Sequence, residues 1–262
     1  MSFIGRKPAD TYKDILQIDN SNNGVSTALK QVKSGNGNGS SLHVSRDKLK
    51  NQPSQDSTES VVLYDADGNA LFTIDTTNDL VKLGISQINA NTQFASFGVS
   101  SADTVWAGKT ENTHTAVPFN SNGLSGAVVT FGTSTNPATT LTIATTADDL
   151  VNSFMVVPNN IVVDAVSFWA GANSASGDTL RCHLMSYDIV STAGSTGGDL
   201  SSGVVVADGS DLVSAGYEQA SYQSMTVQSS SVTAGKVLLF VFRQDSTSSD
   251  YSISASIKYH LV

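Results

Sequence analysis

Residues 127–262 alternate between short apolar segments and turn-forming clusters, and this rhythm restricts most strongly how the chain can fold. Segments rich in Val, Ile, Leu and Phe are separated by clusters such as PNN, SASGD, GSTGGD and DSTSSD. Eight or nine strands in a segment of this length are typical of a β-sandwich or a jelly roll. The sequence therefore predicts an all-β chain that ends in a jelly-roll-like β-sandwich, residues 127–262.

Two segments of this domain have patterns that place them in the sandwich. YSISASIKYHLV alternates its apolar residues at Ile253, Ala255, Ile257 and Tyr259, which predicts a strand with one face in water. KVLLFVFR, residues 236–243, is apolar on both faces and should be a central strand. With 39% hydrophobic and 14% charged residues, the chain has enough apolar side chains to form a core.

Residues 1–56 are polar and basic, and differ in charge from the rest of the chain. Residues 1–50 hold eight basic and four acidic residues, a net charge of +4, so the total of −9 leaves −13 for the remainder. ALKQV at 28–32 and SLHVS at 41–45 flank the turn-forming SGNGNGS and predict a loose hairpin. One hairpin buries too little to be stable alone, so we expect this segment to dock on a partner.

Residues 57–126 begin with a predicted hairpin and continue as a weakly patterned stretch. Strands are expected at 61–64 and 70–74 around Asp67-Gly68, and a third at 80–83. From 84 to 126, isolated aromatic residues stand among Asn, Gln, Ser and Thr, which we interpret as extended, irregular chain. A monomer cannot easily stabilise so long a stretch. We therefore expect a homotrimer with residues 57–125 at its axis.

The acidic segment DADGN at 65–69 invites comparison with a calcium-binding loop. An EF-hand loop places oxygen ligands at positions 1, 3 and 5, Gly at 6 and Glu at 12. Asp65, Asp67 and Asn69 fit the first three positions, but Ala70 and Thr76 stand where Gly and Glu are needed. Asp-Gly is instead a strong signal for a tight turn. The hairpin turn formed by Asp65, Asp67, Gly68 and Asn69 is the preferred interpretation.

Patterns for catalysis, cofactors and metals are not met. GLSGA at 123–127 lacks the last Gly of a nucleophile elbow, and Gly235-Lys236 lacks the rest of a P-loop. His43, His114, His183 and His260 stand far apart without metal-ligand spacing, and are expected on the surface or satisfied within strands. The single cysteine, Cys182, is expected to be a buried, inert thiol. We therefore predict no enzyme activity, no cofactor and no metal site.

Residues 1–84 resemble the N-terminal part of fibre and other structural proteins of tailed phages, especially marine ones. SFIGRKPA and YKDILQIDNSNNGVST carry the likeness at the start. VLYDADGNALFTIDT, at 62–76, is similar to a unit of phage fibre shafts, in which a short strand, a DxDGN turn and a second strand recur. Because 262 residues is short for a main tail fibre, a head fibre, a capsid decoration or a small accessory spike is equally open.

The resemblance implies that the N-terminus docks on the capsid or tail, the shaft trimerises and the tip faces outward. The candidate docking residues are Arg6, Lys7, Tyr12, Ile15 and Leu16. Expected partners are other virion proteins and a host-surface glycan or protein. Neither nucleic-acid binding nor membrane insertion is expected, because the basic residues are scattered and no apolar run approaches 18 residues. The expected location is the virion, after assembly in the host cytoplasm.

The main alternative is a secreted jelly-roll protein that binds or acts on carbohydrate. Five aromatic residues would be available to contact a sugar, although strand aromatics are mostly core: Trp106, Trp169, Tyr187, Tyr217 and Tyr222. The chain has three glutamates, and none suggests a catalytic carboxylate pair. A bacterial adhesin is disfavoured, because MSFIGRKPAD does not resemble an export signal.

Overall fold

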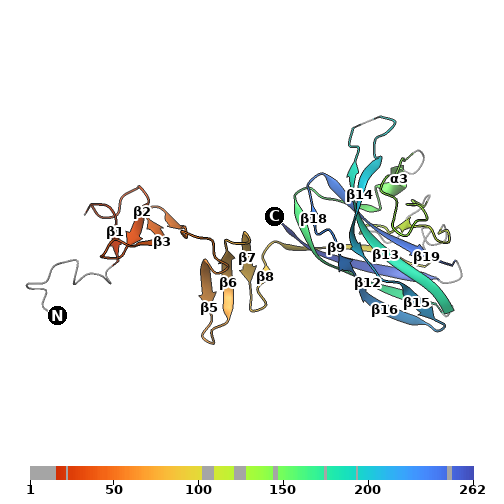
Figure 1. Ribbon diagram of the computed structural model, residues 1–262, viewed down its shortest axis with the longest axis horizontal. Coiled ribbons are helices and arrows are strands. Elements are labelled where there is room, and N and C mark those ends of the chain that lie inside the picture. Colours follow the sequence, from red (N-terminus) through yellow and green to blue (C-terminus); the bar gives the residue numbers. More distant parts are fainter. Residues whose placement is uncertain are drawn as a thin grey trace, which may run out of the picture. The chain divides into compact units, whose positions relative to one another are not determined.

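The computed structural model describes residues 16–21, 23–101, 109–120, 128–143, 147–173, 176–192, 194–246 and 250–262. The chain forms two compact units, Met1–Ala90 and Asn91–Val262 (Figure 1). The strand pairs in the described part of each unit are antiparallel, and the one short helix described is α3 (Ala147–Leu150). This confirms the predicted all-β fold. Within the described residues, no helix is long and apolar enough to cross a membrane.

The first unit contains two four-stranded sheets, each with its strands in chain order. The first sheet is β1 (Gln17–Ile18), β2 (Lys30–Lys33), β3 (Gly39–Val44) and β4 (Leu49–Asn51). The second is β5 (Val61–Tyr64), β6 (Ala70–Asp75), β7 (Leu80–Leu83) and β8 (Ile88–Asn89). The hairpins predicted around SGNGNGS and DADGN are confirmed as β2–β3 and β5–β6.

The second sheet of this unit has one apolar face that its own chain leaves uncovered. The strand register gathers seven apolar residues there, and we call them the apolar face of the β5–β8 sheet: Val61, Leu63, Phe72, Ile74, Val81, Leu83 and Ile88. None of them is buried. Among the described residues of the first unit, Val32 is the one buried hydrophobic side chain. The first unit therefore lacks a substantial core of its own.

The second unit is a sandwich of two sheets. The larger sheet runs β10 (Thr115–Ala116), β19 (Lys236–Gln244), β13 (Ser176–Ile189), β14 (Leu200–Asp208), β17 (Thr226–Val227). Two short strands extend it, β11 (Phe154–Val156) on β19 and β15 (Leu212–Ala215) on β13. The smaller sheet runs β16 (Gln219–Ser224), β12 (Ile161–Ala172), β20 (Tyr251–Leu261), β9 (Thr92–Val99), with β18 (Ser231–Val232) on β12.

Eight of these strands have the connectivity of a jelly roll. In chain order they are β9, β10, β12, β13, β14, β16, β19 and β20. The first pairs with the last, the second with the seventh, the third with the sixth and the fourth with the fifth. A long antiparallel hairpin rolled up on itself gives this pairing, and the two sheets of the roll then pack face to face. The predicted jelly-roll-like sandwich is therefore confirmed.

Apolar side chains cover both faces of the larger sheet. The main core contains residues from both sheets, including Phe168 and Ile257 from one and Phe240 from the other. A second cluster contains Leu239 and Val241 of the larger sheet with side chains of residues 129–154, so it lies on the outer face of that sheet. The expected central strand is thus β19, buried on both faces, and β20 alternates buried and exposed residues from 251 to 257 as predicted.

The boundary expected between residues 126 and 127 lies instead between 90 and 91. Residues 92–99 are not irregular chain but strand β9, which pairs with β20. Phe97 and Val117 are completely or almost completely buried, and the ring of Phe97 lies tilted against that of Phe119, with centroids 5.1 Å apart. The apolar residues of this stretch are sparse, but they pack into a core whose other side chains come from residues 155–257. The local sequence pattern could not reveal this packing, because the partners lie far away in the chain.

Candidate functional site

The docking residues predicted near the N-terminus fall mostly outside the described residues. Arg6, Lys7, Tyr12 and Ile15 lie in the segment that the structure does not describe. Leu16 is described, and 69% of its surface is exposed. Docking through this segment stays a prediction.

The four residues predicted to form the hairpin turn do form it. Asp65 and Asn69 are joined by a backbone hydrogen bond of 2.9 Å, and Gly68 adopts a φ of 84°, which favours glycine. The Oδ1 atom of Asp65 accepts hydrogen bonds from the backbone N–H groups of Asp67 and Asn69, at 3.0 and 2.8 Å. Oδ2 accepts from Nδ2 of Asn69 at 2.9 Å. These bonds, that from the Asn69 side chain first, lower the pKa of Asp65.

This turn is expected not to bind calcium tightly. Both carboxylate oxygens of Asp65 already accept hydrogen bonds from the turn, and a cation would have to replace them. We expect the same melting temperature in millimolar calcium and in EDTA. A calcium-dependent gain of about 3 kcal/mol at saturating ion would contradict this interpretation.

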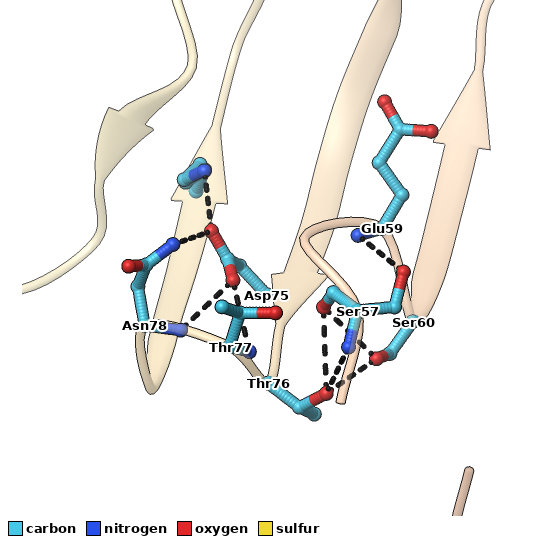
Figure 2. A network of polar contacts seen from close by, with 8 residues as sticks. Ser57, Glu59, Ser60, Asp75, Thr76, Thr77 and Asn78 are labelled. Carbon is cyan, nitrogen blue, oxygen red and sulfur yellow. Dashed lines mark hydrogen bonds and ion pairs between the residues drawn. The ribbon is translucent and has the colours of Figure 1, made fainter. Parts of the chain in front are cut away.

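A second acidic turn, between β6 and β7, contains the most enclosed carboxylate among the described residues of the first unit (Figure 2). Asp75 is 1% exposed, and its Oδ2 atom accepts from Nζ of Lys82 at 2.8 Å and from Nδ2 of Asn78 at 2.9 Å. Oδ1 accepts from the backbone N–H groups of Thr77 and Asn78. Lys82, followed by Asn78, lowers the pKa of Asp75 to about 2.

Beside this turn, hydroxyl groups join the start of β5 to the end of β6. The hydroxyl of Thr76 lies 2.6 Å from that of Ser60, and it accepts from the backbone N–H of Ser57 at 3.0 Å (Figure 2). Both carboxylate oxygens of Asp75 and the hydroxyl groups of Ser60 and Thr76 are held by these hydrogen bonds, so the two networks fasten the turn. The aspartate at the end of the shaft-like FTID segment is therefore structural.

In the second unit, a polar cluster lies at one end of the outer face of the larger sheet. The Arg181 guanidinium donates to both carboxylate oxygens of Asp208, at 3.1 and 2.6 Å. Its neighbour across the sheet, Arg243, donates to the backbone and side-chain oxygens of Asn112. These groups border a pocket of about 230 Å³, whose lining residues are Asn112, Thr179, Arg181, Asp211, Arg243 and Asp245. Opposite charges pair around this pocket, so it has no strong preference for an ion of either sign.

Next to this pocket, two histidines distant in sequence meet inside the protein. The rings of His114 and His183 are fully buried, with centroids 5.1 Å apart and an edge-to-face arrangement. Nε2 of His183 lies 3.1 Å from Oδ1 of Asp208 but is not aligned for a hydrogen bond. Desolvation is the main cause that lowers the pKa of each imidazole to about 4. Both rings are inaccessible to a substrate, so the pair is not a general base.

The expectation that each histidine is exposed or satisfied within its strand is therefore wrong for this pair. Nδ1 of His114 lies 3.3 Å from the carbonyl oxygen of Gly132, while the other three ring nitrogens have no hydrogen-bond partner among the described residues. The pairing depends on β19, which lies between β10 and β13 in the sheet and follows both of them in the chain. No spacing in the sequence signals it. The buried, inert Cys182 is confirmed, and burial raises the pKa of its thiol.

Two aromatic rings stand on the outer face of the smaller sheet. Trp169 of β12 is directly opposite Tyr222 of β16, and their ring centroids are 5.5 Å apart. They are 54% and 55% exposed, so the expectation that strand aromatics belong to the core is wrong here, although it holds for the buried Tyr187. Tyr217 is also exposed, and Trp106 lies outside the described residues. Phe168 and Trp169 are adjacent in an apolar run, so periodicity could not tell which faced water.

A hollow of about 350 Å³ adjoins these rings. It is lined by Ser101, Gly171, Ala172, Asn173, Glu218, Gln219, Asp250 and Ser252. Gly171 lies two residues beyond Trp169 in β12, on the same face, and pairs with Ala220 and Ser252. The aromatic pair and the hollow thus form one continuous surface, which we call the Trp169 face. It combines exposed rings with hydroxyl, amide and carboxylate groups.

Comparison with known proteins adds no relative to this description. No protein-family model matches the chain, and a search of curated proteins finds no match. Function must therefore be inferred from the residues and their arrangement.

Proposed function

We propose that this protein is a structural component of a phage virion, a short homotrimeric fibre, spike or capsid decoration. Its N-terminal segment, residues 1–56, docks on the capsid or tail. The β5–β8 sheet joins three copies, and the jelly roll faces a host surface or a neighbouring virion protein. The resemblance of residues 1–84 to phage fibre proteins supports this assignment, although a fold or a likeness alone does not determine function.

The observation that carries the proposal is the contrast in burial between the two units. The second unit has two apolar clusters and can be stable alone. The first has a single buried hydrophobic residue among those described, Val32, and a sheet with an uncovered apolar face. Such a segment gains its order from contacts with other chains, as an anchor and a trimeric shaft would. Because strands β9 and β10 belong to the jelly roll, we narrow the part of the chain proposed for the trimer axis from 57–125 to 57–90.

A secreted carbohydrate-binding protein is the second candidate, and the exposed pair of Trp169 and Tyr222 favours it. The two candidates differ in location. Mass spectrometry and immunogold electron microscopy of purified particles should find the protein on the virion at stoichiometric occupancy. Its absence from particles, together with its presence in the medium, would favour the secreted protein.

Deletion of residues 1–50 is expected to abolish incorporation into particles while the jelly roll stays folded. The deleted segment carries a net charge of +4 against −13 for the rest of the chain. It contributes no residue to the core of the jelly roll, so its loss should not unfold that unit. Incorporation is measured by particle mass spectrometry, and folding by the thermal transition of the second unit. Truncated protein that decorates particles at normal occupancy would move the anchor to the jelly roll.

If docking depends on the basic residues near the N-terminus, substituting Arg6 and Lys7 by Gln should weaken attachment and its sensitivity to salt. The matched control substitutes Lys48 and Lys50, two exposed basic residues of the same unit, and removes the same charge. Equal losses from both variants would show a general charge effect and exclude a specific contact at Arg6 and Lys7.

A further inference from the structure

We infer that the Trp169 face binds a neutral glycan, with a sugar ring stacked on Trp169 and Tyr222 and its neighbour in the adjoining hollow. This inference rests on the proposed function, in which the jelly roll faces outward. It adds the class of ligand that the Trp169 face would bind. Four features of the described residues support it: two exposed rings, their rigid support, their small neighbours and the polar groups of the hollow.

The exposed rings are held in place before any ligand arrives. Trp169 lies in β12, which is paired with β16 on one side and β20 on the other. The hydroxyl of Tyr222 lies 3.1 Å from that of Ser224, and hydrogen bonds with Ser224 and Ser167 lower the pKa of this hydroxyl. A rigid aromatic platform loses little conformational entropy when it binds a ligand.

Small residues leave the platform open. Across β20, the partners of Ser167, Trp169 and Gly171 are three serines, Ser256, Ser254 and Ser252. A Cβ atom added at Gly171 would meet nothing within 4 Å, so the space over Gly171 is open. A flat ring can therefore approach Trp169 along the strand without displacing a side chain.

The chemistry of the surface fits a sugar better than another protein chain. The π face of an aromatic ring is negative and attracts the polarised C–H groups on one side of a pyranose. Serine hydroxyls surround the rings, whereas the centre of an interface between protein copies is usually apolar. We therefore take a glycan, rather than a second copy of this chain, as the occupant.

The hollow determines which kind of sugar is accepted. Glu218 and Asp250 place carboxylates at its border, and Asn173 and Gln219 add amides. Carboxylates accept hydrogen bonds from hydroxyl groups, and amides both donate and accept. Asp250 is paired with Lys109 at 3.3 Å, which offsets its charge. The Glu218 carboxylate, in a protein with net charge −9, disfavours acidic sugars. A neutral, hydroxyl-rich oligosaccharide meets these conditions.

The test is an array of neutral and acidic oligosaccharides probed with the full-length protein, followed by titration with the neutral oligosaccharide that binds best. Trp106→Phe leaves Trp169 as the sole tryptophan, so its fluorescence reports directly on the ring. We expect binding of neutral glycans, and affinity weakened by roughly tenfold or more in Trp169→Ala and Tyr222→Ala. Tyr64→Ala is the matched control, because Tyr64 is also 55% exposed but lies in the first unit, and should bind normally.

Gly171 provides a second test that removes no contact. Gly171→Gln should block binding by filling the platform, whereas Gly171→Ala, with one added carbon in open space, should retain it. Failure of every neutral oligosaccharide, preference for acidic ones, or unchanged affinity in Trp169→Ala would overturn the inference. Protection of Trp169 from acrylamide quenching in the unliganded protein would also overturn it, because the face would then be an interface between copies.

The outcome can be separated from the test of the proposed function. Protein that occupies particles normally but binds no neutral glycan would refute this inference and leave the virion assignment intact. Protein that is absent from particles but binds neutral glycan through Trp169 would refute the virion assignment and support the glycan site.

Discussion

Acidification from pH 7 to pH 4 is expected to lower the unfolding free energy of the second unit by several kcal/mol, on the order of 2–3 kcal/mol for each of two buried histidines. The pKa values of His114 and His183 fall to about 4 in the folded protein, from an ordinary value of 6.5. Between these pH values the unfolded chain binds more protons. The stabilisation is therefore complete above pH 6.5 and is lost as the pH falls toward 4.

Burial, followed by the charges around the pair, explains why protonation is unfavourable. Desolvation is the largest cause that lowers the pKa of both imidazoles, Arg181 and Arg243 lower it further, and Asp208 opposes the shift at His183. Asp208 is also bound by Arg181 through two hydrogen bonds, and its attraction does not outweigh the desolvation of His183. A loss of this size is a large share of the 5–15 kcal/mol by which domains are usually stable.

Denaturant titrations at pH 7, 6, 5 and 4, followed by tryptophan fluorescence, measure the effect. Both tryptophans of the chain are in the second unit, so the signal reports on it. His183→Gln should flatten the dependence on pH, whatever it costs at pH 7, and His114→Gln should do the same. His43→Gln, in the first unit, is the control and should leave the slope unchanged. A constant unfolding free energy between pH 7 and pH 4.5 would contradict the burial of neutral histidines.

The parts of this structure that sequence reasoning found are those fixed by local pattern. Alternation identified β20, an apolar run on both faces identified β19, and Asp67-Gly68 located the β5–β6 turn. Each of these signals lies in residues that are close together in the sequence, either as the two-residue repeat of a strand or as a turn-forming pair. The rhythm of strands and turns also sufficed for the fold class, because few architectures accommodate so many short strands.

What was missed depends on pairing between distant segments. β9 lacks a strong pattern of its own, yet it completes the smaller sheet because β20, at the other end of the chain, pairs with it. The meeting of His114 with His183 likewise requires β19 between their strands. Trp169 was named as a candidate sugar contact, but its exposure was missed for a different reason: Phe168 and Trp169 are adjacent and apolar, while one faces the core and the other water. A single sequence does not contain the pairing that settles these cases.

Replacement of Leu83 by Asp is expected to convert the protein from a trimer to a monomer. Leu83 lies on the apolar face of the β5–β8 sheet, opposite Phe72 of β6 and Ile88 of β8, and 47% of its surface is exposed in a single chain. In the proposed trimer this face meets its copies at the axis. Each chain then loses a buried leucine, worth about 2 kcal/mol, and places an unpaired carboxylate in an apolar contact.

Symmetry makes this effect large, because three carboxylates would approach one another at the axis. The matched control is Leu71→Asp. Leu71 is 43% exposed and precedes Phe72 in β6, so it lies on the opposite face of the same sheet. It should leave the trimer intact, since its charge remains in water. Sedimentation of the three proteins at micromolar concentration measures the result. A wild-type monomer would refute the trimer, and equal dissociation by both variants would show that the apolar face is not the contact surface.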